Sequence, residues 1–372
     1  MPVLTEEQVM LKDMAQGWAQ EQSPVTAFRK MRDSGVEIAY DAEAWKQMAE
    51  MGLAGVIIPT DFGGSEFGYK SLGLVLEETG KTLTASPLIA SSLAAASALV
   101  LGGTEAQKAE WLPRIADGSL VATLAVDEGP RHAPEKVATT ATKDGEGWSL
   151  NGAKSMVLEG MAAGLFVVSA RTGEGKDGIE LFLVPADAAG VSRERLMLAD
   201  SRGAANVTFA DVKVTDEARL EGGFALLEKV LDRARAGLAA EMLGAATQAF
   251  DNTVEYLKVR EQFGHVIGAF QALQHRAAKM LRDLELARSS VQAALEAIDA
   301  DSDDVPELVS IAKVKVGDTF HLISNEMVQM HGGIGMTDAH DAGFYLKRAR
   351  AAEALFGNQA YHRDRFARLN GY

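Results

Sequence analysis

The 372-residue sequence contains no cysteine. This absence excludes disulfides, thiolate nucleophiles and zinc or iron–sulfur sites built on cysteine, so any redox chemistry needs an organic cofactor. The seven histidines are scattered, with no pair at i, i+4 and no accompanying carboxylate pattern. We therefore expect no metal site and interpret the histidines as structural or surface residues.

Positive charge and long apolar runs are also scarce. The formal net charge of −15 predicts long-range repulsion of nucleic acid, so no nucleic-acid partner is expected. No apolar run reaches about 18 residues, the length of a membrane span. The first residues resemble an acidic amphipathic helix and lack the features of a signal peptide. We expect a soluble, cytoplasmic protein with no membrane partner.

The hydrophobic pattern divides the chain into three domains, at 1–119, 120–222 and 223–372. Residues 1–119 have apolar positions at helical spacing and predict an N-terminal helical domain. Residues 120–222 contain short segments rich in β-forming residues, separated by Gly, Asn and Asp. These segments predict a middle antiparallel β domain, with strands near 122–128, 136–145, 147–158, 164–172, 178–186 and 206–214.

The helical period returns from residue 223 in three stretches, 223–259, 269–298 and 305–331. The first two contain no interior proline, and a helix of about 36 residues would be about 54 Å long. Helices of this length are typical of a four-helix bundle that packs against another subunit. The fold class is therefore α+β, with a C-terminal four-helix bundle after the β domain.

Several motifs then match a known family in order and spacing. The most specific are REQFGHVIGAFQALQHRAAKM, at 260–280, and QMHGGIGM, at 329–336. With MGLAGVIIPTDFGGSEFG, GGTEAQKAEWLPRIADGS and WSLNGAKSMVLEG they resemble the acyl-CoA dehydrogenase family along most of the chain. The resemblance implies FAD, an acyl-CoA substrate and an electron-transfer flavoprotein that reoxidises the flavin. In that family a carboxylate removes the α-proton while the β-hydride passes to FAD.

The resemblance also implies which residues bind the cofactor. In the family these motifs reach the diphosphate and adenine side of an FAD held by a neighbouring subunit, and the matching residues are Arg260, Gln262, Phe263, Gln329, Gly332 and Gly333. Arginine suits a diphosphate because its planar fork donates two parallel hydrogen bonds. Each motif has a plainer interpretation: a helix end with Gly264 at the C′ position for the first, and a glycine turn between helices for the second.

The catalytic carboxylate is missing from its usual positions. The family's Glu aligns with Phe356, and the alternative position, one residue before Arg235, holds Ala234. A relocated base is a further hypothesis. Glu241 lies on the same helical face as Ala234 but roughly 10 Å along the axis. Glu353 is a weaker candidate, because a surface charge on a helix explains it equally well.

Two motifs that contact the flavin ring in the family are altered as well. Thr-Glu-Pro is replaced by Asp127-Glu128-Gly129, and Trp-Ile-Thr by Met156-Val157-Leu158. The losses therefore lie on the ring and substrate side, while the motifs for the other end of FAD are intact. This asymmetry predicts a subunit that completes a partner's flavin site.

The leading hypothesis is a subunit of a heteromeric acyl-CoA dehydrogenase, resembling bacterial heterotetramers that act on steroid side chains. The segment from Leu355 to His362 resembles that group. The alternatives are a homotetramer with a relocated base, a non-catalytic scaffolding subunit, and a flavin monooxygenase or nitroalkane oxidase of the same fold, which fold alone does not separate.

Overall fold

The computed structural model describes residues 4–372, and Met1–Val3 of the predicted N-terminal domain lie outside the described residues. The chain forms two compact units. Unit 1 comprises the residues up to Phe28, Gly73–Thr84 and Arg235–Tyr372; unit 2 comprises Arg29–Leu72 and Ala85–Ala234.

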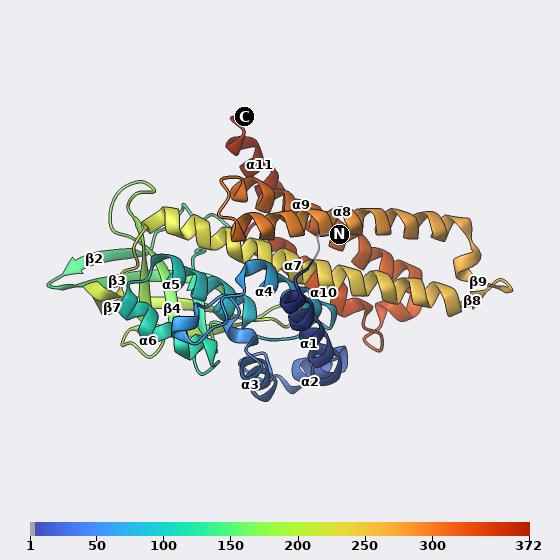
Figure 1. The fold of residues 1–372 in the computed structure, drawn as a ribbon, viewed down its shortest axis with the longest axis horizontal. Helices are drawn as coiled ribbons and strands as arrows, with labels where there is room; N and C mark the ends of the chain where they lie inside the picture. The colour runs from blue at the N-terminus through green and yellow to red at the C-terminus, as the bar shows by residue number, and fades with distance from the viewer. Residues whose placement is uncertain (1–3) are drawn as a thin grey trace. The chain divides into compact units, whose positions relative to one another are not determined.

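Unit 1 is helical. Its helices are α1 (Glu6–Gln22), the end of α4 (Gly68–Lys81), most of α7 (Gly223–Val259), α8 (Gln271–Asp299), α9 (Val305–His331), α10 (Ala342–Ala354) and α11 (Gln359–Leu369). Its short elements are β8 (Glu261–Gln262), β9 (His265–Val266), η5 (Ile267–Ala269) and η6 (Gly332–Met336). The long helices α8 and α9 run beside the second half of α7, and the β8–β9 hairpin lies where α7 passes into α8 (Figure 1). The predicted C-terminal helical domain is confirmed.

The sequence explains where these helices begin and what they bury. Thr5 caps α1 by accepting from the Gln8 amide, and the Gln8 side chain accepts from the Thr5 amide in return. Buried positions on α8 recur every three or four residues, among them Met280, Leu284 and Ala287. One face of α8 therefore packs inward, while the rest of the helix exposes polar side chains together with Leu281 and Leu286.

The end of α4 crosses α7 at backbone contact. A Cβ on Gly244 would lie 1.8 Å from the Glu77 carbonyl oxygen, and one on Gly80 would lie 2.2 Å from the Glu241 carbonyl oxygen. Glycine is therefore required at both positions. The Arg288 guanidinium on α8 donates to the Glu77 carboxylate at 2.6 Å, which ties the crossing to a third helix.

Unit 2 combines helices with the β domain. Its helices are most of α2 (Val25–Ser34), α3 (Ala42–Glu50), η1 (Leu53–Gly55), η2 (Thr60–Phe62), the π-helix η3 (Leu88–Ala95), α5 (Ala96–Gly102), α6 (Glu105–Ala116) and η4 (Asp216–Ala218). Its strands are β1 (Ala122–Ala125), β2 (Thr140–Asp144), β3 (Gly147–Leu158), β4 (Leu165–Arg171), β5 (Ile179–Pro185), β6 (Val191–Met197) and β7 (Gly203–Thr215).

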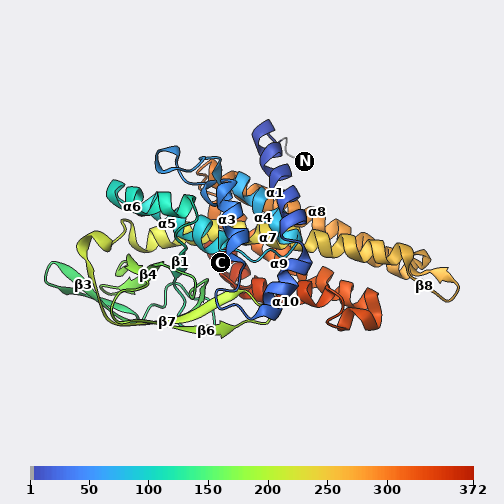
Figure 2. The same ribbon diagram turned by 90° about the horizontal axis from the view of Figure 1, so that it is seen from below.

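The strands form a seven-stranded sheet in the order β1-β4-β2-β3-β7-β6, with β5 paired to β4. Figure 2 shows β7 and β6 side by side. Most pairs are antiparallel as predicted, but β4 pairs in parallel with β1, from Ala122 opposite Leu165 to Ala125 opposite Val168, and with β2, at Thr140 opposite Arg171. The long connection through β2 and β3 allows a parallel pair. The core of the sheet includes Phe166 and Phe209, whose rings meet edge to face at 6.3 Å.

One strand of the seven-stranded sheet was not predicted. β6 forms an edge of the sheet, and its sequence VSRERLM is mostly exposed. Its charged side chains hide the apolar alternation, because an edge strand at the surface has little to bury. Arg195 on this strand donates to the carbonyl oxygens of Gly35 and Val36 at 3.0 Å. No helix within residues 4–372 has both the length and the hydropathy that crossing a membrane requires.

Candidate cofactor site and vacant base position

The first diphosphate motif forms a tight hairpin after α7. Gln262 pairs with His265, and the two residues between them, Phe263 and Gly264, have φ of 56° and 78°. Positive φ at both central residues is typical of a type I′ turn. Gly264 therefore shapes a hairpin and does not cap α7, which ends at Val259. Phe-Gly is an uncommon pair for this turn, so the sequence did not reveal the hairpin.

The hairpin presents exposed side chains, of which Gln262 donates to the Glu261 carbonyl oxygen at 2.7 Å and Phe263 meets the Phe270 ring edge to face. The Phe263 ring is 89% exposed, and within residues 4–372 the Arg260 guanidinium makes no hydrogen bond or ion pair. The Arg260 backbone is fixed at both groups, because its amide donates to the Tyr256 carbonyl at 2.9 Å and its carbonyl accepts from the Ile267 amide at 2.7 Å. A rigid backbone thus carries a free cation.

The second motif follows α9. Gly332 has a φ of 63°, a conformation that favours glycine, and its amide donates to the Gln329 carbonyl oxygen. A Cβ on Gly333 would meet nothing within 4 Å, so packing in this chain does not require glycine there. In contrast, a Cβ on Gly335 would lie 2.7 Å from the Val328 carbonyl oxygen.

An aromatic stack links the two motifs. The Tyr256 ring on α7 stacks on the His331 ring on α9, with centroids 4.2 Å apart, and the His340 ring lies 4.3 Å beyond. His331 Nδ1 lies 2.7 Å from the Met327 carbonyl oxygen, and burial lowers the pKa of His331. The structure therefore brings the segment after Tyr256 beside the segment after His331, although 75 residues separate them.

These residues fit one end of FAD. A free guanidinium, an exposed aromatic ring and a glycine backbone without Cβ obstruction are groups that bind a diphosphate and the flat adenine ring. We call residues 260–263 and 329–333 the diphosphate segments. All of them belong to unit 1.

The base position lies in the turn between α10 and α11. Phe356 and Gly357 both have positive φ, of 56° and 101°, and a Cβ on Gly357 would lie 2.4 Å from the Tyr361 ring. The Phe356 carbonyl oxygen accepts from Arg235 Nε at 3.1 Å and lies 3.2 Å from His362 Nε2. The Arg predicted to mark the alternative base position thus contacts the turn that carries Phe356.

Buried cations hold this turn. Lys313 Nζ on α9 donates to the carbonyl oxygens of Ala352 and Leu355, both at 3.0 Å. Burial, followed by the charge of Arg235, lowers the pKa of Lys313 to about 7, although Glu353 opposes this. The partial negative charge at the C-terminal end of α10 compensates the ammonium group.

The same environment keeps His362 neutral. Burial lowers the pKa of His362 far below its ordinary value, and the charges of Arg235, Lys313 and Arg365 lower it further. The ring is fully buried and its Nδ1 has no hydrogen-bond partner among the described residues. This ring therefore contributes no charge at neutral pH.

The two carboxylates considered as relocated bases are already paired. Glu241 is buried and lies 3.3 Å from Arg348 Nη1. Glu353 contacts His321 Nδ1 at 3.0 Å and Arg350 Nη1 at 3.2 Å. Each carboxylate already contacts cationic side chains of this chain, which counts against both candidates.

The altered ring motifs lie in unit 2, at residues 127–129 and 156–158, which we call the ring segments. The Asp127 carboxylate lies 2.9 and 3.1 Å from His132 Nδ1 and accepts from the Ala133 amide at 3.2 Å. Its polar atoms are therefore used within the loop.

Glu128 has a scaffold role. Its carboxylate accepts from Lys154 Nζ at 2.7 Å and from the amides of Ala138 and Thr139 at 2.6 and 2.9 Å. Burial alone would raise the pKa of Glu128, but the Lys154 ammonium and the hydrogen bonds from Lys154 and Thr139 hold it below its ordinary value. Burial lowers the pKa of Lys154 to about 8, against the opposing charges of Glu128 and Asp127.

The second ring segment contains a bulge in β3. Pairing with β7 shifts register between Lys154 and Val157, and Met156 lies there with a φ of 55° and 42% exposure. Val157 and Leu158 are buried. A flexible thioether therefore stands at the position of the family's tryptophan, without a flat ring to stack on a flavin.

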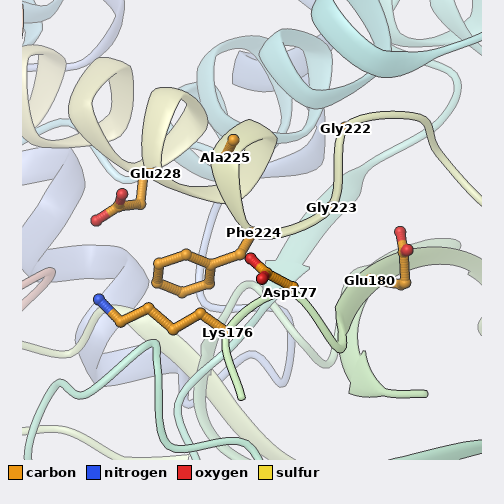
Figure 3. Close-up of a pocket in the computed structure, with 8 residues that line it drawn as sticks. All are labelled: Lys176, Asp177, Glu180, Gly222, Gly223, Phe224, Ala225 and Glu228. Atoms are coloured by element: carbon orange, nitrogen blue, oxygen red, sulfur yellow. The ribbon is translucent and has the colours of Figure 1, made fainter. Parts of the chain in front are cut away.

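Unit 2 also has an open pocket of about 470 Å³ that the sequence did not reveal (Figure 3). Its lining residues are Lys176, Asp177, Glu180, Gly222, Gly223, Phe224, Ala225 and Glu228. The Lys176 ammonium lies 5.1 Å from the Phe224 ring centroid, while burial raises the pKa of Glu180. Three carboxylates against one ammonium disfavour an anionic ligand.

Within residues 4–372, no group of three or more His, Cys, Asp or Glu side chains is placed to hold a metal ion. The histidines make other contacts. His340 contacts the His331 ring, His331 lies beside the Met327 carbonyl oxygen, and His132 contacts the Asp127 carboxylate. The candidate site therefore offers hydrogen-bond donors and buried cations, and no set of metal ligands within residues 4–372.

Comparison with protein families gives three matches in chain order. The acyl-CoA dehydrogenase N-terminal domain matches residues 5–119, the middle domain residues 125–214 and the C-terminal domain residues 221–369. Together they span nearly the whole chain.

Individual proteins agree. The short/branched chain specific acyl-CoA dehydrogenase of Bos taurus is 31% identical over 94% of this chain and 82% of its own length. A chain in the solved structure of the ChsE4-ChsE5 complex from Mycobacterium tuberculosis has a TM-score of 0.92 and 25% identity, with both chains fully covered. A chain in the structure described as the electron transferring flavoprotein of Acidaminococcus fermentans has a TM-score of 0.93 and 29% identity over the full length of both.

The sequence matches and the fold agree over the N-terminal helical, middle β and C-terminal helical regions. The chain therefore belongs to the acyl-CoA dehydrogenase family, the FAD-dependent oxidoreductases that act on the CH–CH bond of acyl-CoA thioesters.

Proposed function

We propose that this chain is one subunit of a heteromeric acyl-CoA dehydrogenase, in which it helps to hold FAD for a second family member and lacks a complete flavin site of its own. One contrast carries the proposal. The Arg260 guanidinium in a diphosphate segment has no partner within residues 4–372, whereas the Asp127 carboxylate in a ring segment is engaged by His132 and Ala133.

The proposed division of labour follows from the residues. In the family's reaction FAD, when bound, accepts the β-hydride. On the diphosphate and adenine side, the residues that would contact the cofactor are Arg260, Gln262, Phe263, Gln329, Gly332 and Gly333. The α-proton needs a carboxylate, and Phe356 supplies none, so the base would come from the partner subunit.

The comparisons support a partner of the same family, because the ChsE4-ChsE5 neighbour is a complex of two differently named chains. We propose a tetramer, an acyl-CoA substrate of the bulky type and an electron-transfer flavoprotein as electron acceptor, the last by analogy with the Acidaminococcus fermentans neighbour. The domain boundaries 1–119, 120–222 and 223–372 and a cytoplasmic location belong to the same proposal.

The test is a flavin count. The chain is purified alone and after co-expression with candidate partners, which are family members that carry the usual Glu. We expect a colourless isolated chain and a yellow complex with about one FAD per two chains, because only one type of subunit has a complete site. A yellow isolated chain with about one FAD per chain would contradict the proposal.

A further inference from the structure

The loop that carries the first ring segment is fastened at both ends. At its start, the Asp127 carboxylate engages His132 Nδ1 and the Ala133 amide. The His132 side chain is 3% exposed and that of Asp127 is 22% exposed, so the contact is largely shielded from water. Shielding strengthens a contact between a carboxylate and an imidazole.

The rest of the loop is attached to β3 and to its own far end. The Ser155 amide donates to the Asp127 carbonyl at 2.7 Å, and the Ser155 hydroxyl donates to the Gly129 carbonyl at 3.2 Å. The Glu128 carboxylate accepts from the amides of Ala138 and Thr139. Residues 127–139 therefore form a loop that is tied at Asp127, Glu128 and Gly129 by contacts within unit 2.

Asp127 also differs chemically from the residue expected there. A threonine hydroxyl can both donate and accept a hydrogen bond, whereas an ionised carboxylate only accepts. The lone pairs of Asp127 are turned toward His132 and Ala133, which leaves a negative charge and no donor at this position.

We propose that the Asp127–His132 contact is a latch that holds residues 127–139 closed and so prevents this chain from seating a flavin ring of its own. The inference rests on the proposed function, since it gives the reason why one of two homologous flavin positions stays empty. Opening the latch should free the loop and the position aligned with the family's ring contact.

The test uses the isolated full-length chain. His132→Ala removes the imidazole, and Asp127→Asn is a nearly isosteric second variant that keeps an acceptor for the Ala133 amide. Lys213→Ala is the matched control, because it removes an exposed ion pair with Asp144 and Asp211 from the same sheet. Hydrogen exchange of the 127–139 amides is followed by mass spectrometry, and FAD uptake by quenching of flavin fluorescence.

We expect both latch variants to raise exchange within 127–139 at least about tenfold and to increase FAD uptake, while the control changes neither. Unchanged exchange in both variants would overturn the latch. Faster exchange without FAD uptake would overturn its role in excluding the ring. A wild-type isolated chain that already holds about one FAD per chain would contradict the proposed function. A colourless wild type, with both variants unchanged in exchange and FAD uptake, would contradict only the latch.

Discussion

The diphosphate segments and the ring segments differ in how their polar groups are used. In the former, Arg260 is exposed and without a partner in residues 4–372, and Gly333 leaves open space where a Cβ would stand. In the latter, Asp127 and Glu128 are engaged by the loop's own amides and by neighbouring side chains. A polar group without a partner in the described chain is available to bind a ligand, whereas a group that is already hydrogen-bonded within the chain is not.

The difference indicates where a cofactor is expected to contact the chain. An unpaired cation at an exposed hairpin costs little, because water solvates it until a ligand replaces the water. A partly buried carboxylate without a partner costs more, and both carboxylates of the ring segments have partners within this chain. The two buried lysines, Lys154 in unit 2 and Lys313 in unit 1, also differ in the groups that their ammonium groups contact.

The largest predicted effect concerns turnover. The isolated chain should show no dehydrogenation of any acyl-CoA with an artificial electron acceptor, because no carboxylate stands at Phe356 or Ala234 and a general base is worth about 10²–10⁴-fold in rate. Phe356→Glu and Ala234→Glu should both fail to restore it, since the ring segments remain closed. The complex with a Glu-bearing partner should be active.

Restored activity in either single variant of the isolated chain would break the comparison, because it would mean that a flavin ring is already seated here. A preparation that is yellow and active without a partner, and that loses activity on Glu241→Gln, would instead establish the relocated-base homotetramer.

The next effect compares the two buried lysines. Lys154→Met leaves Glu128 without its cation and should lower the free energy of unfolding by roughly 2–4 kcal/mol. Lys313→Met should cost less, because Lys313 contacts only carbonyl oxygens and its ammonium is itself costly to bury. Denaturant unfolding at pH 7 measures the free energy of unfolding of both variants. An equal loss in the two variants would contradict the predicted difference between the lysines.

The pH dependence of the Lys313 variant has a definite sign. The folded-state pKa of about 7 lies below the ordinary lysine pKa of 10.5, so between these pH values the unfolded state binds more protons. The stability of the wild type relative to Lys313→Met should therefore rise from pH 7 to pH 10 and be lowest below pH 7. A difference that falls with pH would show that Lys313 is not buried as described.

Much of the fold was predictable from the sequence. The long helices follow from apolar periodicity and most strands from segments rich in β-forming residues, while the cofactor residues stay a prediction from the resemblance to a family. β6 was missed because an exposed edge strand has no apolar alternation to detect. The Tyr256–His331 stack was missed because it joins residues far apart in the chain, and a lone histidine gives no signal of its neighbours.

The sequence predicts an empty base position at Phe356, but it did not reveal the cations that hold this turn. Lys313 and His362 look like ordinary helix residues in the sequence, because only the packed structure brings them to the carbonyl groups of one turn. The closing of Asp127 by His132 was likewise invisible, since a five-residue spacing within a loop fixes no geometry.

A smaller effect is expected at the diphosphate segments. In the purified complex, Arg260→Ala should weaken FAD retention about 10–100-fold through the loss of a charge-assisted contact of about 1.5–3 kcal/mol, and Gln262→Ala should weaken it less. Lys279→Ala, which removes an exposed positive charge from α8, is the control and should change nothing. Unchanged flavin content in both variants would refute the assignment of the hairpin.

The smallest predicted effect distinguishes a glycine that the fold of this chain requires from one that only a bound cofactor would require. Gly333→Ala should leave the thermal unfolding midpoint of the isolated chain unchanged, because its Cβ meets nothing within 4 Å and its φ is not positive. FAD retention in the complex should nevertheless fall several-fold, since a methyl group would obstruct close approach of the cofactor. Gly244→Ala is the opposite case: its Cβ would lie 1.8 Å from the Glu77 carbonyl oxygen, so the helix crossing must open and the midpoint should fall by several degrees. If Gly333→Ala instead lowered the midpoint as Gly244→Ala does, the glycine would serve the fold of this chain. The diphosphate segments would then be no more available to a ligand than the ring segments are.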